Sequence, residues 1–432
     1  MTSMPSSTAQ PEATSPKRLR ITDLRNPVLT ESQQQTWAYA EANPITLSVD
    51  SVLSAAREQT SLGDFGPDDF RERLALWLDE IDADPNRSPV SRMVTHSACT
   101  RYAANRLRVL DVLRRHPEIH DEEVVAPIIV VGLPRSGTTH LLNLMSADSR
   151  FRSLPLWESQ EPVPFAGDEL GVDGVDPRLL RSQERWNQMQ AKSPLVAAMH
   201  PMTPEHIHEE LELESLDFSS YNFEWMSSMA PRWRDYYLAH DQRPHYDFIK
   251  TMLKLLQWQR GPNRWILKCP QHLEQLGPLM DTFPDATVVM THRDPVSVVQ
   301  SAATMVGYGA RMNFHELDLD AVCDYWIDRV SRLLDAGTRD LALIPDERRV
   351  DVYFDQFMAN DIGTVEHIYN RAGLEMTEQA RGEIREYMSS HKRGSNGQVV
   401  YDLRADFGRE PAELRTRFAN YFDAFSVKVE VL

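Results

Sequence analysis

The residues best placed to do chemistry form a short loop, Gly132 to Thr139, with the sequence GLPRSGTT. An apolar, β-branched run at 127–132 leads into it, and a predicted helix opens at Thr138 or Thr139 in THLLNL. Strand, glycine loop and helix together favour phosphate binding, because backbone N–H groups and the helix N-terminus present partial positive charge to an anion. The loop therefore predicts an anion site, most simply for the phosphates of a nucleotide.

The loop differs from that of the nucleotide triphosphatases. Gly132 and Gly137 keep the G-x-x-x-x-G spacing, but Thr138 and Thr139 stand where Lys and Ser or Thr are expected. Arg135 lies inside the loop instead, and no aspartate at a strand end indicates a magnesium site. A kinase or nucleotide hydrolase of the same loop architecture is an alternative that the missing lysine disfavours.

Composition limits the class of protein. The chain has 432 residues and a formal net charge of -18, so it can bury a large core and is too acidic for nonspecific nucleic-acid binding. Three cysteines, Cys99, Cys269 and Cys323, lie far apart without a CxxC motif, which suggests neither a zinc site nor disulfides and favours a cytoplasmic protein. No apolar run reaches the roughly 20 residues of a membrane helix.

Alternating strand and helix patterns predict the fold class. Strand-like runs occur at 127–132 and in FRSLPLWES, RWILKCP, ATVVMTHRDP and RRVDVYFDQF, with helical patterns between them. This order predicts an α/β fold, a P-loop-like parallel sheet flanked by helices. We expect a disordered tail at 1–25, an N-terminal helical region at 26–122 and an α/β domain at 123–432 with a helical insertion at about 167–262.

Two motifs give the sequence a family resemblance. PRSGTT after an apolar strand resembles the 5′-phosphosulfate loop of sulfotransferases that use 3′-phosphoadenosine-5′-phosphosulfate (PAPS). In MTHRDPVSVVQS, Arg293 and Ser301 match in type and spacing the arginine and serine that grip the 3′-phosphate in that family. GLPRSGTTHLLNL, LKCPQHLEQL, FPDATVVMTHRDP and FANYFDAF resemble the broad bacterial branch, and the similarity runs from about Asp69 to the end of the chain.

The resemblance implies a metal-free sulfotransferase that moves a sulfuryl group from PAPS to a hydroxyl of a small or lipidic acceptor. A catalytically silent nucleotide-binding protein on the same scaffold is a further alternative. HKRGSNGQ resembles the family segment that closes over the 3′-phosphate. The residues that the resemblance brings to the donor are Arg135, Ser136, Gly137, Thr138, Thr139, Arg293, Ser301, Arg393 and Gly394.

Two residues compete for the role of general base. Glu158, at the expected end of the second strand in LPLWES, resembles the catalytic glutamate of tyrosylprotein and some mycobacterial sulfotransferases. His272, after the third strand in LKCPQH, comes two residues later than the histidine of cytosolic sulfotransferases, and Lys268 resembles the lysine that contacts the transferring group. Both candidates lie at predicted carboxyl ends of strands, where open α/β sheets bind ligands. We favour Glu158 over His272.

The segment PEHIHEELELES also carries side chains that bind metals: His206, His208, Glu209 and Glu210. It reads equally as a solvated acidic helix, and because the family needs no metal we expect no metal site. The Met- and aromatic-rich insertion beside the loop is expected to cover an apolar acceptor.

Overall fold

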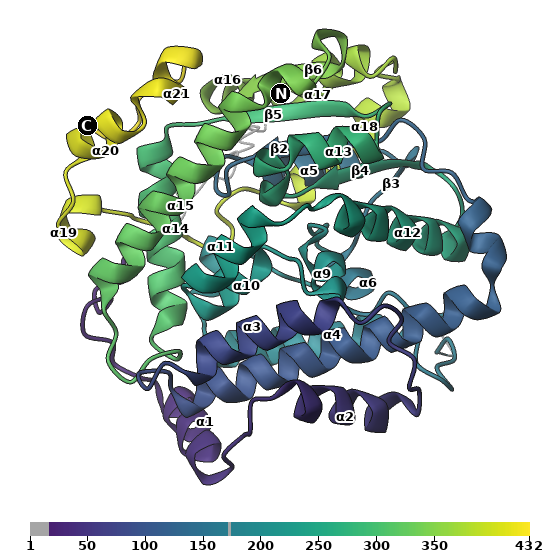
Figure 1. Cartoon of the computed structure of the whole chain (residues 1–432). Helices are drawn as coiled ribbons and strands as arrows, with labels where there is room; N and C mark the ends of the chain where they lie inside the picture. The colour runs from purple at the N-terminus through teal and green to yellow at the C-terminus, as the bar shows by residue number, and fades with distance from the viewer. Residues whose placement is uncertain (1–16, 172–173) are drawn as a thin grey trace, which may run out of the picture.

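A five-stranded parallel sheet forms the centre of the molecule in the computed structural model, which describes residues 17–171 and 174–432 (Figure 1). The strand order is β3-β4-β2-β5-β6. The strands are β2 (Ile128–Gly132), β3 (Phe151–Arg152), β4 (Arg264–Lys268), β5 (Thr287–His292) and β6 (Arg349–Tyr353). The predicted α/β class is confirmed, and each of the five predicted strands is present.

The central strand β2 is buried on both faces. Because side chains alternate along a strand, Ile128 and Val130 pack into one apolar cluster, while Ile129 and Val131 pack into another. Helices on both sides supply the rest of these clusters, as is usual for parallel sheets. The helices that follow the loop and the later strands are α5 (Thr138–Ser146), α13 (Leu276–Thr282), α14 (Pro295–Ala310), α15 (Leu319–Arg339), α16 (Phe354–Ala359), α17 (Asp361–Arg371) and α18 (Glu378–Ser390).

In the described part of the chain, four α-helices precede the sheet and lie at the bottom of Figure 1, separated from the sheet by helices of the insertion. They are α1 (Glu31–Ala42), α2 (Val49–Thr60), α3 (Phe70–Asp82) and α4 (Pro89–Arg115). Ion pairs tie them to the insertion: Arg73 of α3 and Arg106 of α4 both bind Asp217, at 3.2 and 2.7 Å. His245 also hydrogen-bonds Asp217. A buried carboxylate therefore joins the N-terminal helices to the rest of the molecule.

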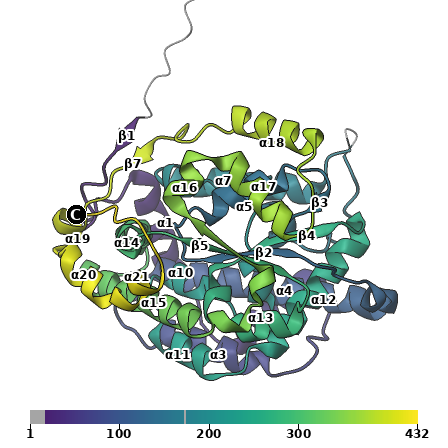
Figure 2. The same cartoon turned by 90° about the horizontal axis from the view of Figure 1, so that it is seen from above.

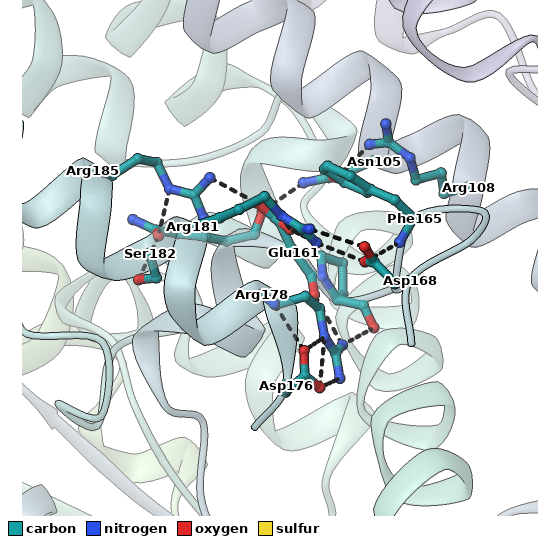
Figure 3. Close-up of polar contacts among 12 residues, drawn as sticks. Asn105, Arg108, Glu161, Phe165, Asp168, Asp176, Arg178, Arg181, Ser182 and Arg185 are labelled. Atoms are coloured by element: carbon teal, nitrogen blue, oxygen red, sulfur yellow. Dashed lines mark hydrogen bonds and ion pairs between the residues drawn. The ribbon is translucent and has the colours of Figure 1, made fainter. Parts of the chain in front are cut away.

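The insertion between β3 and β4 is helical. Its elements are α6 (Leu156–Gln160), α7 (Pro177–Lys192), α8 (Val196–Met199), α9 (Leu211–Glu214), α10 (Asn222–Ser227), α11 (Pro231–Ala239) and α12 (Arg243–Arg260). A salt-bridge network fastens α7 to the segment before it (Figure 3). Arg181 and Arg185 each lie 2.7 Å from the buried carboxylate of Glu161, and Arg181 also binds Asp168 at 2.7 Å.

The N-terminal segment corrects one prediction. Strand β1 (Arg18–Leu19) pairs in parallel with β7 (Gln398–Val399) (Figure 2). The side chains of Ile21 and Leu24 are buried. The expected disordered tail at 1–25 is therefore wrong for residues 17–25, because a partner strand 380 residues away orders them. The first 16 residues of that predicted tail lie outside the described residues.

The C-terminal part of the chain forms α19 (Leu403–Phe407), α20 (Pro411–Arg417) and α21 (Ala419–Ala424). Its last residues run back to the N-terminal end of α14, where Asp294 accepts hydrogen bonds from the backbone N–H groups of Glu430 and Val431. Within the described part of the chain, each helix is too short or too polar to cross a membrane.

Candidate active site

The loop after β2 is shaped by close packing against β5. A Cβ atom on Gly132 would lie 2.1 Å from the Oγ1 atom of Thr291, so only glycine fits there. Ser136 donates its N–H and its hydroxyl to the carbonyl of Leu133, at 3.3 and 2.6 Å, and its Oγ lies 2.7 Å from Thr291 Oγ1. The Ser136 hydroxyl therefore makes hydrogen bonds to the loop and to β5, and these bonds hold the loop in its shape.

Two residues in the last part of the loop have a positive φ, Arg135 with 68° and Gly137 with 90°. Gly137 is the N-cap of α5, and no side chain caps this helix end. The first N–H groups of a helix have no partner inside the helix, so the Gly137–Thr139 backbone is available to an anion at the positive end of the helix dipole. The local structure thus agrees with an anion site at this loop.

Arginines from distant parts of the sequence gather beside the loop. Arg293, just after β5, donates to the Arg135 carbonyl at 2.6 Å, and Arg135 donates to the hydroxyl of Ser301 at 3.0 Å. They border a pocket of about 540 Å³, which Arg393 and Gly394 also line. The structure therefore brings Arg135 of the loop, Arg293 of the second motif, and Arg393 and Gly394 of the HKRGSNGQ segment to one pocket, with Ser301 in contact with Arg135. The other lining residues are Ala198, Ser297, Gln300, Gly397, Gln398, Val399, Tyr401, Glu430 and Val431.

A carboxylate from the C-terminal segment, which we define as residues 425–432, sits in this pocket. Both oxygens of Glu430 accept hydrogen bonds of 2.8 Å from Arg293, through Nε and Nη2. Ser297 donates to the same carboxylate at 3.4 Å. Glu430 thus holds an anionic group against the arginine that the sequence assigns to the 3′-phosphate. The sequence did not reveal this residue, because no local pattern links positions 293 and 430.

Arg393 is held at the edge of the pocket by its own partners. It forms an ion pair with Asp361, at the start of α17, and contacts His140 of α5 at 2.7 Å. These contacts bring the loop after α18 toward the helix that follows the phosphate loop.

Lys268 lies at the carboxyl end of β4, beside the loop. Its buried ammonium group donates to the Thr139 hydroxyl at 3.2 Å and forms an ion pair with Glu209. Burial and the nearby Arg135 lower the pKa of Lys268 to about 7, whereas the Glu209 carboxylate favours the charged ammonium. The resemblance gave Lys268 a role at the transferring group, and its contact with Thr139 agrees with that role.

A second, mainly apolar cavity of about 220 Å³ also borders the loop. Arg135 lines both this cavity and the arginine-rich pocket. Thr138, Thr139 and Glu209 contribute polar groups to its wall. Its apolar wall includes Val196, Met202, Leu211, Trp225 and Met305, from the insertion and α14. The predicted apolar cover over the loop is thus present as a cavity wall.

Glu158 is placed differently from the prediction. It lies in helix α6, not at a strand end, because β3 has only two residues and the chain turns at Pro155. Its carboxylate is fully buried, accepts two hydrogen bonds of 2.7 Å from Arg152 and lies 3.3 Å from Arg260. It does not line the cavity beside the loop.

His272 is also separated from that cavity. It lies in a 3₁₀ turn after β4, buried, with Nδ1 2.7 Å from the Tyr246 hydroxyl and Nε2 3.8 Å from a Glu210 oxygen. The lining residues of the cavity that the structure describes include neither His272 nor Glu158. The structure thus leaves both sequence candidates for the base apart from the loop and brings Glu209 to it.

The acidic segment itself corrects an expectation. Every residue from His208 to Glu214 is buried, so PEHIHEELELES is not a solvated helix. Two of its carboxylates form ion pairs with residues outside the segment: Lys268 binds Glu209, and Arg101 binds Glu212 at 2.7 Å. The clustering of acids was visible in the sequence, but their cationic partners lie more than 50 residues away.

A larger cavity, about 1390 Å³, lies elsewhere. Its walls include Arg108, Phe165 and Arg178, near the network of Figure 3, together with Trp157 and Trp258. Among the residues that the structure describes, its lining includes none of the predicted site residues. Volume alone therefore does not locate the chemistry, and we assign the active site to the two cavities that share Arg135.

Known proteins match this chain in sequence and in structure. The model described as the sulfotransferase family matches residues 127–378, more than half of the chain. The omega-hydroxy-beta-dihydromenaquinone-9 sulfotransferase Stf3 of Mycobacterium tuberculosis (strain CDC 1551 / Oshkosh) is 24% identical over 327 residues, 69% of this chain and 76% of that protein. The same protein of Mycobacterium bovis matches equally.

Two solved structures extend the similarity to nearly the whole fold. Sulfotransferase STF9 from Mycobacterium avium superimposes with a TM-score of 0.80 at 25% identity, covering 90% of this chain and 99% of that one. Sulfotransferase STF1 from Mycobacterium tuberculosis H37Rv gives 0.76 at 25% identity, with 86% and 98% covered. Loop, fold and family model agree, and the chain belongs to the sulfotransferase family.

Proposed function

We propose that this sulfotransferase takes its sulfuryl group from PAPS and transfers it to the hydroxyl of a small or lipidic, largely apolar acceptor. The observation that carries the proposal is the position of Arg135, which lines both an arginine-rich pocket and an apolar cavity. Donor and acceptor, each beside this loop, would meet where the loop and Lys268 supply positive charge.

The arginine-rich pocket suits a nucleotide with two separate anionic groups. Arg293 and Arg393 line it and would bind the 3′-phosphate, and the loop with its helix end suits the 5′-phosphosulfate. Arginine favours phosphate because its planar fork can make two parallel hydrogen bonds. The carboxylate of Glu430 supports this assignment, since it already accepts two such bonds from Arg293.

The reaction needs one bond to form and one to break. The acceptor oxygen forms a bond to sulfur, the bond from sulfur to the 5′-phosphate oxygen breaks, and adenosine 3′,5′-bisphosphate (PAP) leaves. Negative charge grows on the leaving phosphate, where the backbone N–H groups of the loop, Arg135 and Lys268 would stabilise it. The hydroxyl proton must be accepted by a base in the acceptor cavity.

Glu209 is the best candidate for that base. It lines the acceptor cavity and contacts Lys268, which in turn contacts Thr139 of the loop. Glu158 is held by Arg152 and Arg260, and His272 faces Tyr246. We therefore assign proton acceptance to Glu209 in place of both residues favoured by the sequence.

The acceptor class follows from the cavity wall and from a relative. Val196, Leu211 and Trp225 favour an apolar group next to the reacting hydroxyl. The name of the mycobacterial relative gives it an omega-hydroxylated menaquinone, a lipid with a terminal hydroxyl. A cavity of about 220 Å³ would admit the end of such a chain, not its whole length.

Nucleotide binding tests the donor assignment. Calorimetry should show that PAP binds tightly, whereas ATP with magnesium and adenosine 5′-monophosphate bind weakly. Arg293→Ala should weaken PAP by roughly 1.5–3 kcal/mol, about 10- to 100-fold, because a charge-assisted contact to the 3′-phosphate is lost. Its effect on adenosine 5′-monophosphate should be small.

The matched control is Arg339→Ala, which removes an exposed arginine at the end of α15 and should leave PAP binding unchanged. Preference for ATP with magnesium would support a kinase instead. Equal losses for PAP and the monophosphate in Arg293→Ala would remove Arg293 from the 3′-phosphate site.

A further inference from the structure

Three histidines lie together in the segment between α8 and α9. Among the described residues, His200, His206 and His208 each offer a ring nitrogen, and these three atoms lie within 4.8 Å of one another. The ring centroids of His200 and His206 are 5.6 Å apart, and those of His200 and His208 are 6.4 Å apart. The sequence suggested only two of these residues as ligands, because His200 precedes the HIH motif by six positions.

The backbone explains why the rings converge. His208 donates its N–H to the Leu154 carbonyl at 2.7 Å, and Ile207 exchanges two hydrogen bonds of 3.2 Å with the Asn143 side chain of α5. Ile207 also forms an isolated bridge with Pro155, so the segment is locally strand-like. In such a backbone residues i and i+2 face the same way. His206 and His208 therefore share one face, while Ile207 packs against the core on the other.

The rings have nitrogen atoms to offer a ligand. His206 Nε2 and His208 Nδ1 are buried and have no hydrogen-bond partner among the described residues. A buried polar atom without a partner destabilises the folded state, and a bound ion would remove that cost. A neutral imidazole binds a metal ion through such a free nitrogen atom.

The site borders the acceptor cavity. His200 and His208 line that cavity together with Glu209 and Thr139. Three protein ligands with a fourth position facing a cavity is the arrangement of catalytic zinc sites, whereas structural zinc sites use four protein ligands. Imidazole groups suit zinc, copper, iron and nickel more than magnesium or calcium.

We propose that His200, His206 and His208 bind one divalent ion of the zinc class, with a free coordination position facing the acceptor cavity. This site goes beyond the assigned chemistry and contradicts our expectation, from the family resemblance, of no metal. At that position the ion would hold the acceptor hydroxyl oxygen. That role rests on the proposed function, but metal binding itself does not.

Nearby charge bears on the proposal in both directions. The cations closest to the histidines are Lys268 and Arg135, and both oppose a further positive ion. Glu209 pairs with Lys268 and so offsets that charge, whereas Glu212, which lines the same cavity, already pairs with Arg101. Three neutral ligands leave the ion its full charge, so its binding depends on the histidine nitrogen atoms.

Metal content and a cobalt spectrum test the proposal without an activity assay. Full-length, untagged protein is stripped with a chelator, loaded with Co²⁺ and freed of excess ion. We expect one cobalt ion per chain and the intense visible bands of a four-coordinate ion. The His206→Ala, His208→Ala double variant should lose cobalt affinity by more than about 100-fold, the upper end of the cost of losing a supporting contact.

The control is His367→Ala, which removes an exposed histidine of α17 and should bind cobalt as the unaltered protein does. PAP binding by every variant serves as the test of folding and separates the two proposals. If the double variant binds PAP and cobalt normally, the histidine site is wrong and the donor site stands. A sulfur-to-cobalt charge-transfer band would also overturn it, since it would locate the ion at the buried group of Glu214, Cys269 and His272.

Discussion

At the scale of single residues, the assignment of the general base depends on which buried glutamate lies beside the loop. Glu158, Glu209 and Glu210 are all buried, so burial does not distinguish them. Contacts do: Arg152 holds Glu158, the Lys268 backbone N–H donates to Glu210 at 3.1 Å, and only Glu209 of the three lines the acceptor cavity.

Glu209→Gln tests the assignment of the base. It keeps the size of the side chain but removes the proton acceptor, so turnover should fall by about 10²–10⁴-fold while PAP affinity stays nearly unchanged. Labelled PAPS with a hydroxylated acceptor measures the rate, and calorimetry measures the affinity. The matched control is Glu205→Gln, an exposed glutamate four residues earlier, which should keep full activity. Normal turnover by Glu209→Gln would return the role to the sequence candidates.

Glu158→Gln should act on stability. Neutralising this side chain leaves Arg152 buried opposite an amide, and breaking a buried pair in this way costs about 3–5 kcal/mol. Urea unfolding should show that loss in the free energy of unfolding. Turnover per folded molecule should stay close to that of the unaltered enzyme. A fully stable but inactive variant would instead identify Glu158 as the base.

At the scale of elements, the C-terminal segment covers the donor pocket with its own anion. Glu430 binds Arg293 through two hydrogen bonds, and Asp294 anchors the backbone on either side of it. A bound 3′-phosphate would have to replace this carboxylate on Arg293.

Glu430→Gln should therefore tighten PAP binding. Removing a partly exposed competitor of this kind is worth roughly 1 kcal/mol, about fivefold in affinity. Calorimetry at low salt is the measurement, and Glu413→Gln, an exposed acid on α20, is the control for the change in net charge. Weaker PAP binding by Glu430→Gln would mean that the carboxylate orders the pocket and does not compete for it.

The strands and the loop could be predicted because their signals are local. A β-branched run followed by GLPRSGTT specifies a buried strand, a tight turn and a helix start within about a dozen residues, and α5 begins at Thr138 as expected. The motif that contains Arg293 and Ser301 is also local in the sequence, so both residues could be predicted. Both contact Arg135 in the structure.

The remaining features depend on partners far along the chain. Strand β1 needs β7, Glu209 needs Lys268, and Glu430 needs Arg293. Acidic composition predicts solvation for PEHIHEELELES unless the cations that pair with it are known. The bend at Pro155 likewise moved Glu158 from a strand end into a helix, where Arg152 binds it.

At the scale of the whole molecule, Asp217 joins α3, α4 and α12. Burial by itself raises the pKa of Asp217. The hydrogen bond with His245 and the charges of Arg73 and Arg106 together have the larger effect, and they bring the pKa below its ordinary value of 3.8. A carboxyl group with a lowered pKa stabilises the fold above its unfolded pKa, and that contribution is lost as the pH falls through the lower, folded value.

Stability should consequently drop in acid, below about pH 4. At neutral pH, Asp217→Asn should have a lower free energy of unfolding than the unaltered protein. This difference should become smaller below about pH 4, as the carboxyl group of the unaltered protein takes up its proton. Urea unfolding across this pH range measures the difference. A difference of constant size would show that the carboxylate charge does not contribute.

Transfer of an isotopically labelled sulfuryl group from PAPS tests the central claim most directly. Mass spectrometry should detect one labelled group on a hydroxylated apolar lipid, with PAP released in equal amount, and none on the same lipid lacking the hydroxyl. Glu209→Gln should slow the transfer. A protein that binds PAP but transfers label to none of a set of lipid alcohols, phenols and sugars would contradict the account and indicate a silent nucleotide-binding protein.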